Sequence, residues 1–305
     1  MSNLAPIVLF VYDRLDKTKK TINALQKNKL AKYSDLYIYS DAAKSKKIQN
    51  CVDEVRQYIE CINGFGKVII IYREKNWGLA NSIIDGVTSI INKYGKVIVL
   101  EDDLVTSPYF LKYMNDALLF YKNKKKVWHI SGWNYLINTS SLEDIFLWRL
   151  MNCWGWATWQ DRWQSFEKNT DKIMDQFSET EINRFNLDGT ADFWAQVIAN
   201  KKKKINTWAI FWYATIFKND GLCLNPTQTF VENIGQDGSG VHCKGGNSYC
   251  GELSTCKNIE FNEVFSENKI ALSRIQKLYI NQKKSILVRI INKVFRMFIK
   301  RNIIK

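Results

Sequence analysis

The sequence predicts an α/β fold in which helices flank a mainly parallel central sheet. The chain has 305 residues, of which 46% are hydrophobic, so it can form one large globular domain or two small ones. Through its first half, short apolar stretches alternate with segments of helical periodicity, which is the pattern of βαβ units. One continuous apolar run lies between Gly95 and Pro108, as expected of an interior parallel strand.

Strands and helices can be assigned in order along this first half. A strand at Pro6–Tyr12 precedes a helix at Asp16–Lys27, which carries Ile22 and Leu25 on one face. The turn between them contains no glycine, so the fingerprint of dinucleotide-binding enzymes is absent. Further strands are expected at Leu36–Ser40, Lys67–Ile71, Val97–Glu101 and Val127–Ser131, and further helices at Lys46–Cys61, Leu79–Asn92 and Pro108–Tyr121.

The second half, Gly132–Cys243, has a mixed pattern and is rich in tryptophan. A helix is expected at Asp192–Lys204, and Asn206–Pro226 predicts a helix followed by a strand. Gly235–His242 is a glycine-rich loop that contains one of the two histidines. The other, His129, lies in an apolar strand, so we expect it in the core.

Three consecutive acids, Glu101, Asp102 and Asp103, follow directly after the predicted interior strand. Ligands of open α/β sheets bind beyond the carboxyl ends of such strands. Neighbouring carboxylates repel one another there, and a bound Mg²⁺ or Mn²⁺ removes the repulsion. The acids therefore suggest a metal site for a phosphate-bearing substrate. A solvated turn or helix-start charges are the alternative, since Ser107-Pro108 favours a helix entry.

The positive charge is concentrated at the end of the sequence. The net charge is +14, and eleven basic residues with no acid lie between Lys269 and Lys305, which leaves +3 for the rest. This distribution argues against a nucleic-acid-binding domain, whose basic residues would lie on the folded body. The end of the sequence also predicts a helix with an apolar stripe and a basic row about 200° away. The stripe is Leu287, Ile291, Val294 and Phe298, and the basic row is Arg289, Lys293, Arg296 and Lys300.

Such a basic amphipathic helix is suited to an anionic membrane surface. A terminal helix docked on the protein's own core is the alternative.

The seven cysteines include no CxxC pair, so we expect no zinc site and reduced thiols. Met1–Pro6 leads directly into a strand, and no apolar run is long enough to span a membrane. We therefore expect a cytoplasmic protein, peripheral at the inner face of the cell membrane, without a signal peptide.

Six motifs follow one another along residues 5–243. They are PIVLFVYDR, a strand ending in YSDA, REKNWGLANSI, VIVLEDDL, CWGW and NPTQTFVENIGQDGSGVH. In this order they resemble bacterial glycosyltransferases of the GT-A fold that act in lipopolysaccharide or capsule assembly. They are also similar in layout to the N-acetylglucosaminyltransferase I family. The resemblance implies a GT-A domain at 1–265, with a nucleotide-sugar-binding half (1–131) and an acceptor-binding half (132–265), followed by a basic helical tail (266–305).

The resemblance implies a metal site at the acids. Asp103 matches the family's metal-binding acid, which holds Mn²⁺ or Mg²⁺ against both phosphates of a nucleotide sugar. Asp102 matches an acid near the ribose or the metal, and Glu101 matches one that faces the donor sugar. In many GT-A enzymes a late histidine completes the metal shell, and His242 at the end of the glycine-rich loop matches it. Neutral imidazole suits Mn²⁺ as a ligand.

Further donor-binding residues follow from the same resemblance. Asp41 matches the acid that accepts a hydrogen bond from the nucleobase, and Arg14 matches a donor-site arginine whose fork can reach phosphate or base. Asn76 and Gly78 lie in the loop where the chain passes near the nucleotide. A helix cap for Asp41 and a surface ion pair for Arg14 are the structural alternatives.

The resemblance also implies an acceptor site. Trp154, Gly155 and Trp156 match its floor, and a buried aromatic corner is the alternative. An inverting enzyme needs a carboxylate that deprotonates the acceptor hydroxyl. The family often has this acid within a W-D-x-x-W motif, but here Ala209 follows Trp208. The substitute candidates for the base are Asp192, before Phe193-Trp194, and Asp237.

Together these features predict a metal-dependent, inverting glycosyltransferase that moves a hexosyl or N-acetylhexosaminyl group from a nucleotide sugar, expected to be a UDP-sugar, to a glycan or lipid-linked acceptor. The first alternative is an inactive relative that binds sugar nucleotides, which Ala209 favours. A nucleic-acid-binding protein is supported by total charge alone. A nucleotidyltransferase shares the acids but normally has a glycine-rich, basic loop after the first strand, which this chain lacks.

Overall fold

In the computed structural model of the chain, which describes residues 4–235 and 251–282, the first half alternates strands and helices as predicted. The predicted strands and helices of this half lie within a few residues of their expected positions, and β5 is an additional short strand. The elements are β1 (Ile7–Val11), α1 (Leu15–Gln26), a 3₁₀ turn (Ala31–Tyr33), β2 (Leu36–Ser40), a second 3₁₀ turn (Lys46–Ile48), α2 (Gln49–Glu60), β3 (Val68–Tyr72), α3 (Leu79–Tyr94), β4 (Lys96–Glu101), β5 (Leu104–Thr106), α4 (Phe110–Phe120) and β6 (Val127–Ser131).

The second half contains more strands than its sequence pattern indicates. The helix-then-strand prediction for Asn206–Pro226 is confirmed by α9 and β9, and the helix predicted at Asp192–Lys204 is present as the shorter α8. Residues 269–282 are also helical. The elements are β7 (Ile145–Trp148), β8 (Trp156–Trp159), α5 (Gln160–Trp163), α6 (Thr170–Gln176), α7 (Glu179–Phe185), α8 (Trp194–Lys201), α9 (Ala209–Lys218), β9 (Leu222–Pro226) and β10 (Val231–Asn233).

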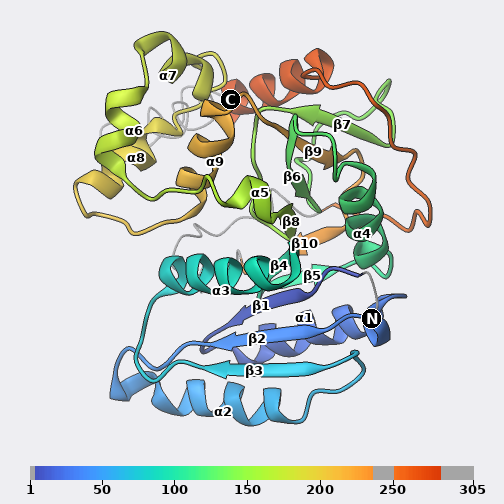
Figure 1. The fold of residues 1–305 in the computed structure, drawn as a ribbon, viewed down its shortest axis with the longest axis vertical. Coiled ribbons are helices and arrows are strands. Elements are labelled where there is room, and N and C mark those ends of the chain that lie inside the picture. Colours follow the sequence, from blue (N-terminus) through green and yellow to red (C-terminus); the bar gives the residue numbers. More distant parts are fainter. Residues whose placement is uncertain (1–3, 236–250, 283–305) are drawn as a thin grey trace, which may run out of the picture.

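The strands of the described ranges form one eight-stranded sheet in the order β3-β2-β1-β4-β8-β6-β9-β7 and a small sheet of β5 and β10 (Figure 1). Strands β1–β4 are parallel, as their helical crossovers require, and the second half of the sheet is mixed. In register, Val11 lies opposite Ser40, and Phe10 lies opposite Glu101. The carboxyl ends of β1, β2 and β4 therefore meet at one edge of the sheet. The predicted α/β class, with helices flanking a large central sheet, is confirmed.

Two apolar layers cover the two faces of the sheet. Successive side chains of β1 point alternately into one layer and the other. Val8 and Phe10 face the layer formed by α3 and α5–α9, which also holds most of the buried tryptophans. Ile7 and Leu9 face the layer formed with α1, α2 and α4. Figure 1 shows α6–α8 gathered beyond β8, away from the β1–β3 half.

His129 lies in the first of these layers, at the centre of an aromatic group, so its prediction as a core residue is confirmed. It is fully buried, its Nε2 lies 2.9 Å from the carbonyl oxygen of Asn152, and Trp212 Nε1 donates to its Nδ1 at 3.2 Å. The ring of Trp156 stacks on it at 5.4 Å. Burial lowers the pKa of His129 to about 3, so the imidazole is neutral.

The start of the predicted tail is packed on the body of the protein. Ala271 and Ile275, in the helix of residues 269–282, are fully buried. Ahead of this helix, Arg149 Nη2 donates to Glu267 at 2.7 Å. Residues 269–282 therefore belong to the folded body. The predicted apolar stripe and basic row lie at 283–305, outside the described residues.

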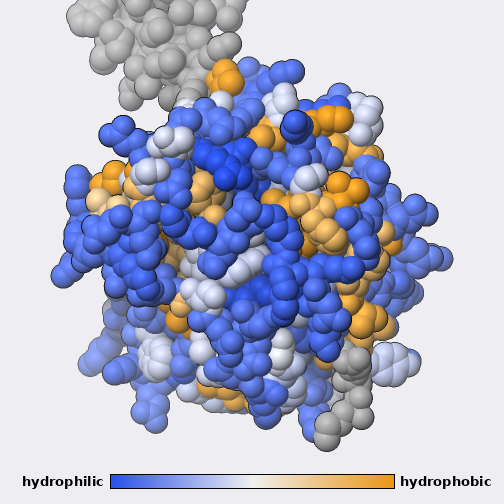
Figure 2. Space-filling view, turned by 45° about the horizontal axis from the view of Figure 1, so that its top comes forward, coloured by the Kyte–Doolittle hydropathy of each residue, from blue (hydrophilic) through white to orange (hydrophobic). Residues whose placement is uncertain are grey.

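The face of the molecule in Figure 2 is mostly hydrophilic, and its hydrophobic residues form small separate patches. Large apolar side chains that are exposed come from different parts of the chain, for example Leu119 in α4 and Val264 in a loop. Across the described residues, no helix combines the length and the apolar character needed to cross a bilayer.

Candidate functional site

The three acids form a turn at the carboxyl end of β4. Glu101 is the last residue of β4, and β5 begins directly after Asp103. Because β5 leaves the main sheet to pair with β10, the segment after β10 reaches the turn, and Ile234 N donates to the carbonyl oxygen of Asp103 at 2.9 Å. From the other side, Thr21 Oγ1 of α1 donates to the carbonyl oxygen of Asp102 at 2.8 Å. The acid turn is therefore held by two elements distant in sequence.

Arg14 faces this turn and forms an ion pair with its acids, whereas its role in donor binding stays a prediction. It follows β1, which is the neighbour of β4 in the sheet, and it directly precedes α1. Its Nη2 donates to Asp102 and, at 2.9 Å, to Asp103 Oδ2. Burial alone would lower the pKa of Arg14, but the charges of Asp102 and Asp103 raise it above its ordinary value.

One guanidinium does not balance three carboxyl groups. Burial raises the pKa of Glu101 to about 8, and the charges of Asp103 and Asp102 add to this shift. Burial also raises the pKa of Asp102 to about 6, against the attraction of Arg14. Asp102 is only 4% exposed, and its Oδ2 has no hydrogen-bond partner within the described part of the chain. A buried carboxylate oxygen without a partner fits a cation that the protein alone does not supply.

The donor set at this turn fits a Mg²⁺ or Mn²⁺ ion that shares its shell with a substrate. In the residues that the structure describes, no three Asp, Glu, His or Cys side chains converge as a complete metal cage. Mg²⁺ at phosphate sites is commonly held by one or two carboxylates together with phosphate oxygens. Asp102 and Asp103 can supply such carboxylates. The predicted ligand His242 and the predicted base Asp237 lie outside the described residues.

Gly235 brings the glycine-rich segment to the acids. Two hydrogen bonds hold this segment in place. The backbone nitrogen of Gly235 donates to Asn233 Oδ1 at 2.8 Å, and Lys17 Nζ donates to the carbonyl oxygen of Ile234 at 2.9 Å. A Cβ added at Gly235 would lie 2.1 Å from Asp103 Oδ2. The glycine therefore permits a backbone approach to the carboxylate that any side chain would block.

Asp41 anchors the loop between β3 and α3. Its carboxylate accepts hydrogen bonds from Trp77 N at 2.9 Å, from Gly78 N at 2.8 Å and from Asn76 Nδ2 at 3.2 Å. It also accepts one from Ala42 N at 2.9 Å. The structure brings together the predicted donor residues Asp41, Asn76 and Gly78, and it gives Asp41 a positioning role. Its contact with a nucleobase stays a prediction.

A stacked pair beside this loop was not predicted from the sequence. The guanidinium carbon of Arg73 lies 3.9 Å from the ring centroid of Trp77 and 5.0 Å from that of Tyr39. Arg73 also forms an ion pair with Asp85 of α3. The motif REKNWG contains both Arg73 and Trp77, but only the folded loop shows that they stack.

The three residues predicted for the acceptor floor lie near the acid turn but differ in exposure. Gly155 has φ of +62°, and a Cβ there would lie 2.8 Å from Val231 of β10 and 3.4 Å from Leu100 of β4. Trp154 is half-buried. Trp156 is 1% exposed and contributes to the core, so the buried-corner interpretation describes it. Acceptor contacts of Trp154 and Gly155 stay predictions.

Asp192 lies on the surface, apart from the acid turn. It is exposed, and its Oδ1 accepts a hydrogen bond from Ala195 N at 3.3 Å at the start of α8. Within the described ranges, Asp192 forms no hydrogen bond with the acids. Its role as the base stays a prediction.

In comparisons with known proteins, this chain is similar to several solved structures. No protein-family model and no curated protein matches the chain. The chain is similar to residues 1–349 of S. aureus TarS, with 11% identity and a TM-score of 0.39, over 74% of this chain and 59% of that one. It is also similar to the mannosyltransferase PcManGT from Pyrobaculum calidifontis, solved in complex with GDP-Man and Mn²⁺, with 8% identity and a TM-score of 0.39 over 70% of each chain.

Proposed function

We propose that this chain is a metal-dependent glycosyltransferase of the GT-A fold that moves a hexosyl or N-acetylhexosaminyl group from a UDP-sugar to a glycan or lipid-linked acceptor, with inversion. The observation that supports it is the buried acid turn after β4. There, one arginine faces three carboxyl groups, and Asp102 Oδ2 lacks a partner within the described residues. Such a turn at the carboxyl edge of a parallel sheet suits a cation and a diphosphate.

The donor would bind along the carboxyl ends of β1, β2 and β4. Asp103, Asp102 and His242 would hold the metal, which when bound offsets negative charge on the leaving nucleoside diphosphate. Arg14 Nη1 is buried and has no hydrogen-bond partner among the described residues, so it can donate to a phosphate oxygen. The loop that Asp41 anchors would position Asn76 and Gly78 against the nucleotide. Glu101 would face the donor sugar.

The base that deprotonates the acceptor hydroxyl would be Asp192 or Asp237, since Ala209 occupies the place of the family's acid. Asp237→Asn and Asp192→Asn should therefore be compared in turnover and in donor binding. The base variant should lose turnover and keep donor binding.

An inactive relative that binds sugar nucleotides is the second candidate. Ala209 favours it, and so does Arg14, which already bonds both Asp102 and Asp103. Incubation with UDP-sugars and Mn²⁺ separates the two candidates. Slow hydrolysis of the donor supports the enzyme, and binding without any release of UDP supports the inactive relative.

We also propose that residues 283–305 attach the protein to an anionic membrane surface, close to a lipid-linked acceptor of lipopolysaccharide or capsule assembly. Sedimentation with vesicles of phosphatidylglycerol and phosphatidylcholine tests this. The full chain should bind the anionic vesicles, and a chain ending at Gln282 should not. Equal binding of both chains would refute the membrane role of the tail.

The experiment that tests the proposed function is a thermal-shift screen of UDP-, GDP-, CMP- and dTDP-sugars with and without Mn²⁺. One nucleotide sugar should raise the melting temperature only when Mn²⁺ is present. Asp103→Asn should remove this shift, because it removes a carboxylate charge with little change of shape. Asp116→Asn, on the exposed surface of α4, is the matched control and should keep it. A shift that persists in Asp103→Asn would refute the metal site.

A further inference from the structure

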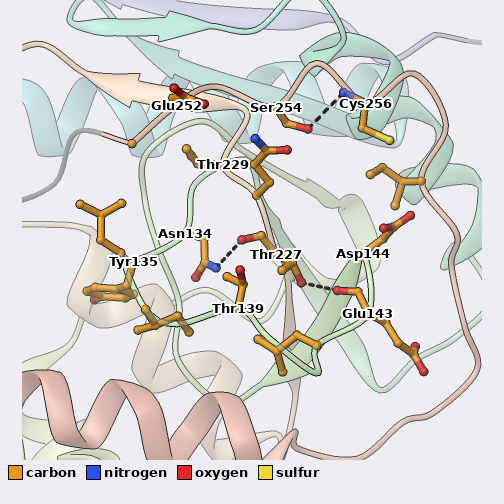
Figure 3. A pocket seen from close by; sticks show the side chains of 16 residues that line it. Asn134, Tyr135, Thr139, Glu143, Asp144, Thr227, Thr229, Glu252, Ser254 and Cys256 are labelled. Atoms are coloured by element: carbon orange, nitrogen blue, oxygen red, sulfur yellow. Dashed lines mark hydrogen bonds between the residues drawn. The ribbon is translucent and has the colours of Figure 1, made fainter.

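A cavity of about 560 Å³, drawn in Figure 3, lies beyond the carboxyl ends of β6 and β9. The pairing of the strands places it at the same edge of the sheet as the acid turn. It is lined by three segments, 134–144 after β6, 227–229 after β9, and 251–259. Strands β6 and β9 are parallel neighbours, so both end at the cavity. Strand β8 separates β6 from β4, and its residue Trp156 lies opposite both Ser131 and Val99. The cavity and the acids are therefore one strand apart along this edge.

The chain itself limits the distance between the two places. Thr229 lines the cavity, and Asn233, four residues on, pairs with Leu104 beside the acid turn. Four residues of fully extended chain span at most about 14 Å. A short oligosaccharide that occupies the cavity can therefore extend to a donor sugar held at the acids.

One buried polar atom in the cavity wall lacks a partner. Asn134 is 3% exposed, and its Nδ2 donates to the carbonyl oxygen of Thr227 at 3.1 Å, which fixes the orientation of the amide (Figure 3). Its Oδ1 is buried and accepts no hydrogen bond within the residues that the structure describes. Buried amide oxygens are nearly always paired, so this atom calls for a donor from a ligand or a water.

The charge of the cavity wall determines which hydrogen-bonding groups of a ligand can bind there. Glu143, Asp144 and Glu252 line the cavity, and none of its described lining residues is Lys, Arg or His, although the chain carries a net charge of +14. Asp144 Oδ2 accepts a hydrogen bond from Glu260 N at 3.1 Å, and Glu143 accepts one from Asn262 Nδ2. These partners are uncharged groups, so the negative charge of the wall is not neutralised by them. Carboxylates accept from hydroxyl and ammonium groups and repel phosphates and other carboxylates.

Part of the remaining wall is apolar. Leu136, Ile137, Leu142 and Ile259 line the cavity together with the ring of Tyr135. Aliphatic and aromatic surface beside a few fixed acceptors is the usual make-up of a small-molecule site. A sugar has both features, since its rings present C–H faces and its hydroxyls donate hydrogen bonds.

We propose that this cavity binds a sugar unit of the acceptor, and that this unit is neutral or carries an amine. The inference rests on the proposed glycosyltransferase activity and narrows its acceptor class. Asn134 Oδ1 accepts from a hydroxyl or amide N–H of this sugar, and Glu143, Asp144 and Glu252 exclude uronic acids and phosphorylated sugars. The phosphates of a lipid-linked acceptor therefore lie elsewhere.

A glycan array tests the inference, with neutral, amine-bearing, uronic-acid and phosphorylated glycans probed by the labelled full-length chain. Binding should be confined to the neutral and amine-bearing glycans. Asn134→Leu should weaken it about tenfold, because it removes the buried acceptor at similar volume. Glu252→Lys, at an exposed position, should weaken binding of amine-bearing glycans and admit acidic ones. Glu263→Gln, an exposed acid that pairs with Lys124 and does not line the cavity, is the control and should change nothing.

The outcomes separate this inference from the proposed function. Preference for acidic glycans, absence of binding to every glycan, or unchanged binding by Asn134→Leu and Glu252→Lys would overturn the acceptor inference. Donor binding is measured separately by the Mn²⁺-dependent thermal shift. If that shift is present while the array result fails, the proposed function stands and the cavity assignment falls. If the array result holds without any donor shift, the chain binds sugars at this cavity and the proposed transferase function falls.

Discussion

Gly235 lies against the carboxylate of Asp103, so closely that a Cβ at residue 235 would be 2.1 Å from Asp103 Oδ2. Non-bonded heavy atoms do not approach to that distance, so alanine at 235 must displace the carboxylate or the segment after β10. The place of Asp103 and the path of the glycine-rich segment are thus determined together.

Gly235→Ala should weaken Mn²⁺-dependent binding of the nucleotide sugar about tenfold or more, which corresponds to at least about 1.4 kcal/mol. The reason is the forced displacement of a proposed metal ligand. Titration calorimetry of the UDP-sugar in the presence of Mn²⁺ measures the change. Gly251→Ala is the control, because its nearest neighbour is the flexible end of Leu136, and it should bind the donor normally. Equal donor affinity in both variants would show that the Gly235 contact does not matter for the donor.

Arg14→Gln should lower the free energy of unfolding and make it depend on metal. It removes the cation that bonds Asp102 and Asp103, and the loss of one partner from a partly buried ion pair costs about 2–3 kcal/mol. Added Mn²⁺ should restore more stability to this variant than to the unaltered chain, because the acids are left without a counter-charge. Urea unfolding with and without Mn²⁺ provides the measurement.

The control for Arg14→Gln is Lys112→Gln, since Lys112 pairs with Asp116 on the exposed surface of α4. Such surface pairs contribute less than about 1 kcal/mol. If Mn²⁺ stabilised Arg14→Gln and the unaltered chain equally, the acids would not be the cation site.

His129 should make the protein sensitive to mild acid. Burial lowers its pKa to about 3, whereas an unfolded histidine titrates near pH 6.5. As the pH falls below about 6.5, the unfolded state takes up a proton that the folded state refuses. The stabilising contribution of neutral His129 is therefore complete above that pH and decreases by about 1.4 kcal/mol per pH unit below it, or about 2 kcal/mol by pH 5.

His129→Gln should flatten this slope, because glutamine can donate to the Asn152 carbonyl and accept from Trp212 without titrating. The comparison uses urea unfolding of both proteins at pH 7, 6 and 5. The raised pKa values of Glu101 and Asp102 act with the opposite sign in both proteins, so they cancel in the difference. Parallel slopes would show that His129 is not buried in the neutral form.

The first half of the fold follows from sequence pattern because its elements are local. Strands are predicted at Leu36–Ser40 and Val127–Ser131, and β2 and β6 have these bounds in the structure. In the second half, β8 and β10 form only through pairing with β4, β6 and β5, and strands of three or four residues give no measurable period. Long-range pairing, which sequence periodicity does not report, decides them.

The candidate site shows the same division. Arg14, Asp102 and Asp103 each end or follow a strand of the parallel half, so the sequence could predict that they meet. Asn134 and Gly235 could not be recognised in the same way. Whether Asn134 Oδ1 finds a hydrogen-bond partner depends on how the chain leaves β6 and β9. The distance from Gly235 to Asp103 depends on the pairing of β5 with β10.

The last prediction concerns where the folded body ends. A basic tail is expected at 266–305, yet Glu267 pairs with Arg149, Asn268 N donates to the Leu147 carbonyl at 2.7 Å, and Ile275 is fully buried. Truncation after Phe265 should therefore lower the free energy of unfolding by at least about 3 kcal/mol, because it leaves Arg149 without its closest carboxylate. Truncation after Gln282 should leave stability unchanged.

Thermal unfolding of the two truncated chains beside the full chain measures this difference. Glu267→Gln in the full chain isolates the ion pair from the apolar contacts, and it should account for part of the loss. Because the helix of residues 269–282 contributes core residues, the membrane-binding function proposed for the tail must reside in 283–305. Equal melting temperatures for the chains ending at Phe265 and Gln282 would instead place the whole of 266–305 outside the folded body and restore the boundary that the sequence predicts.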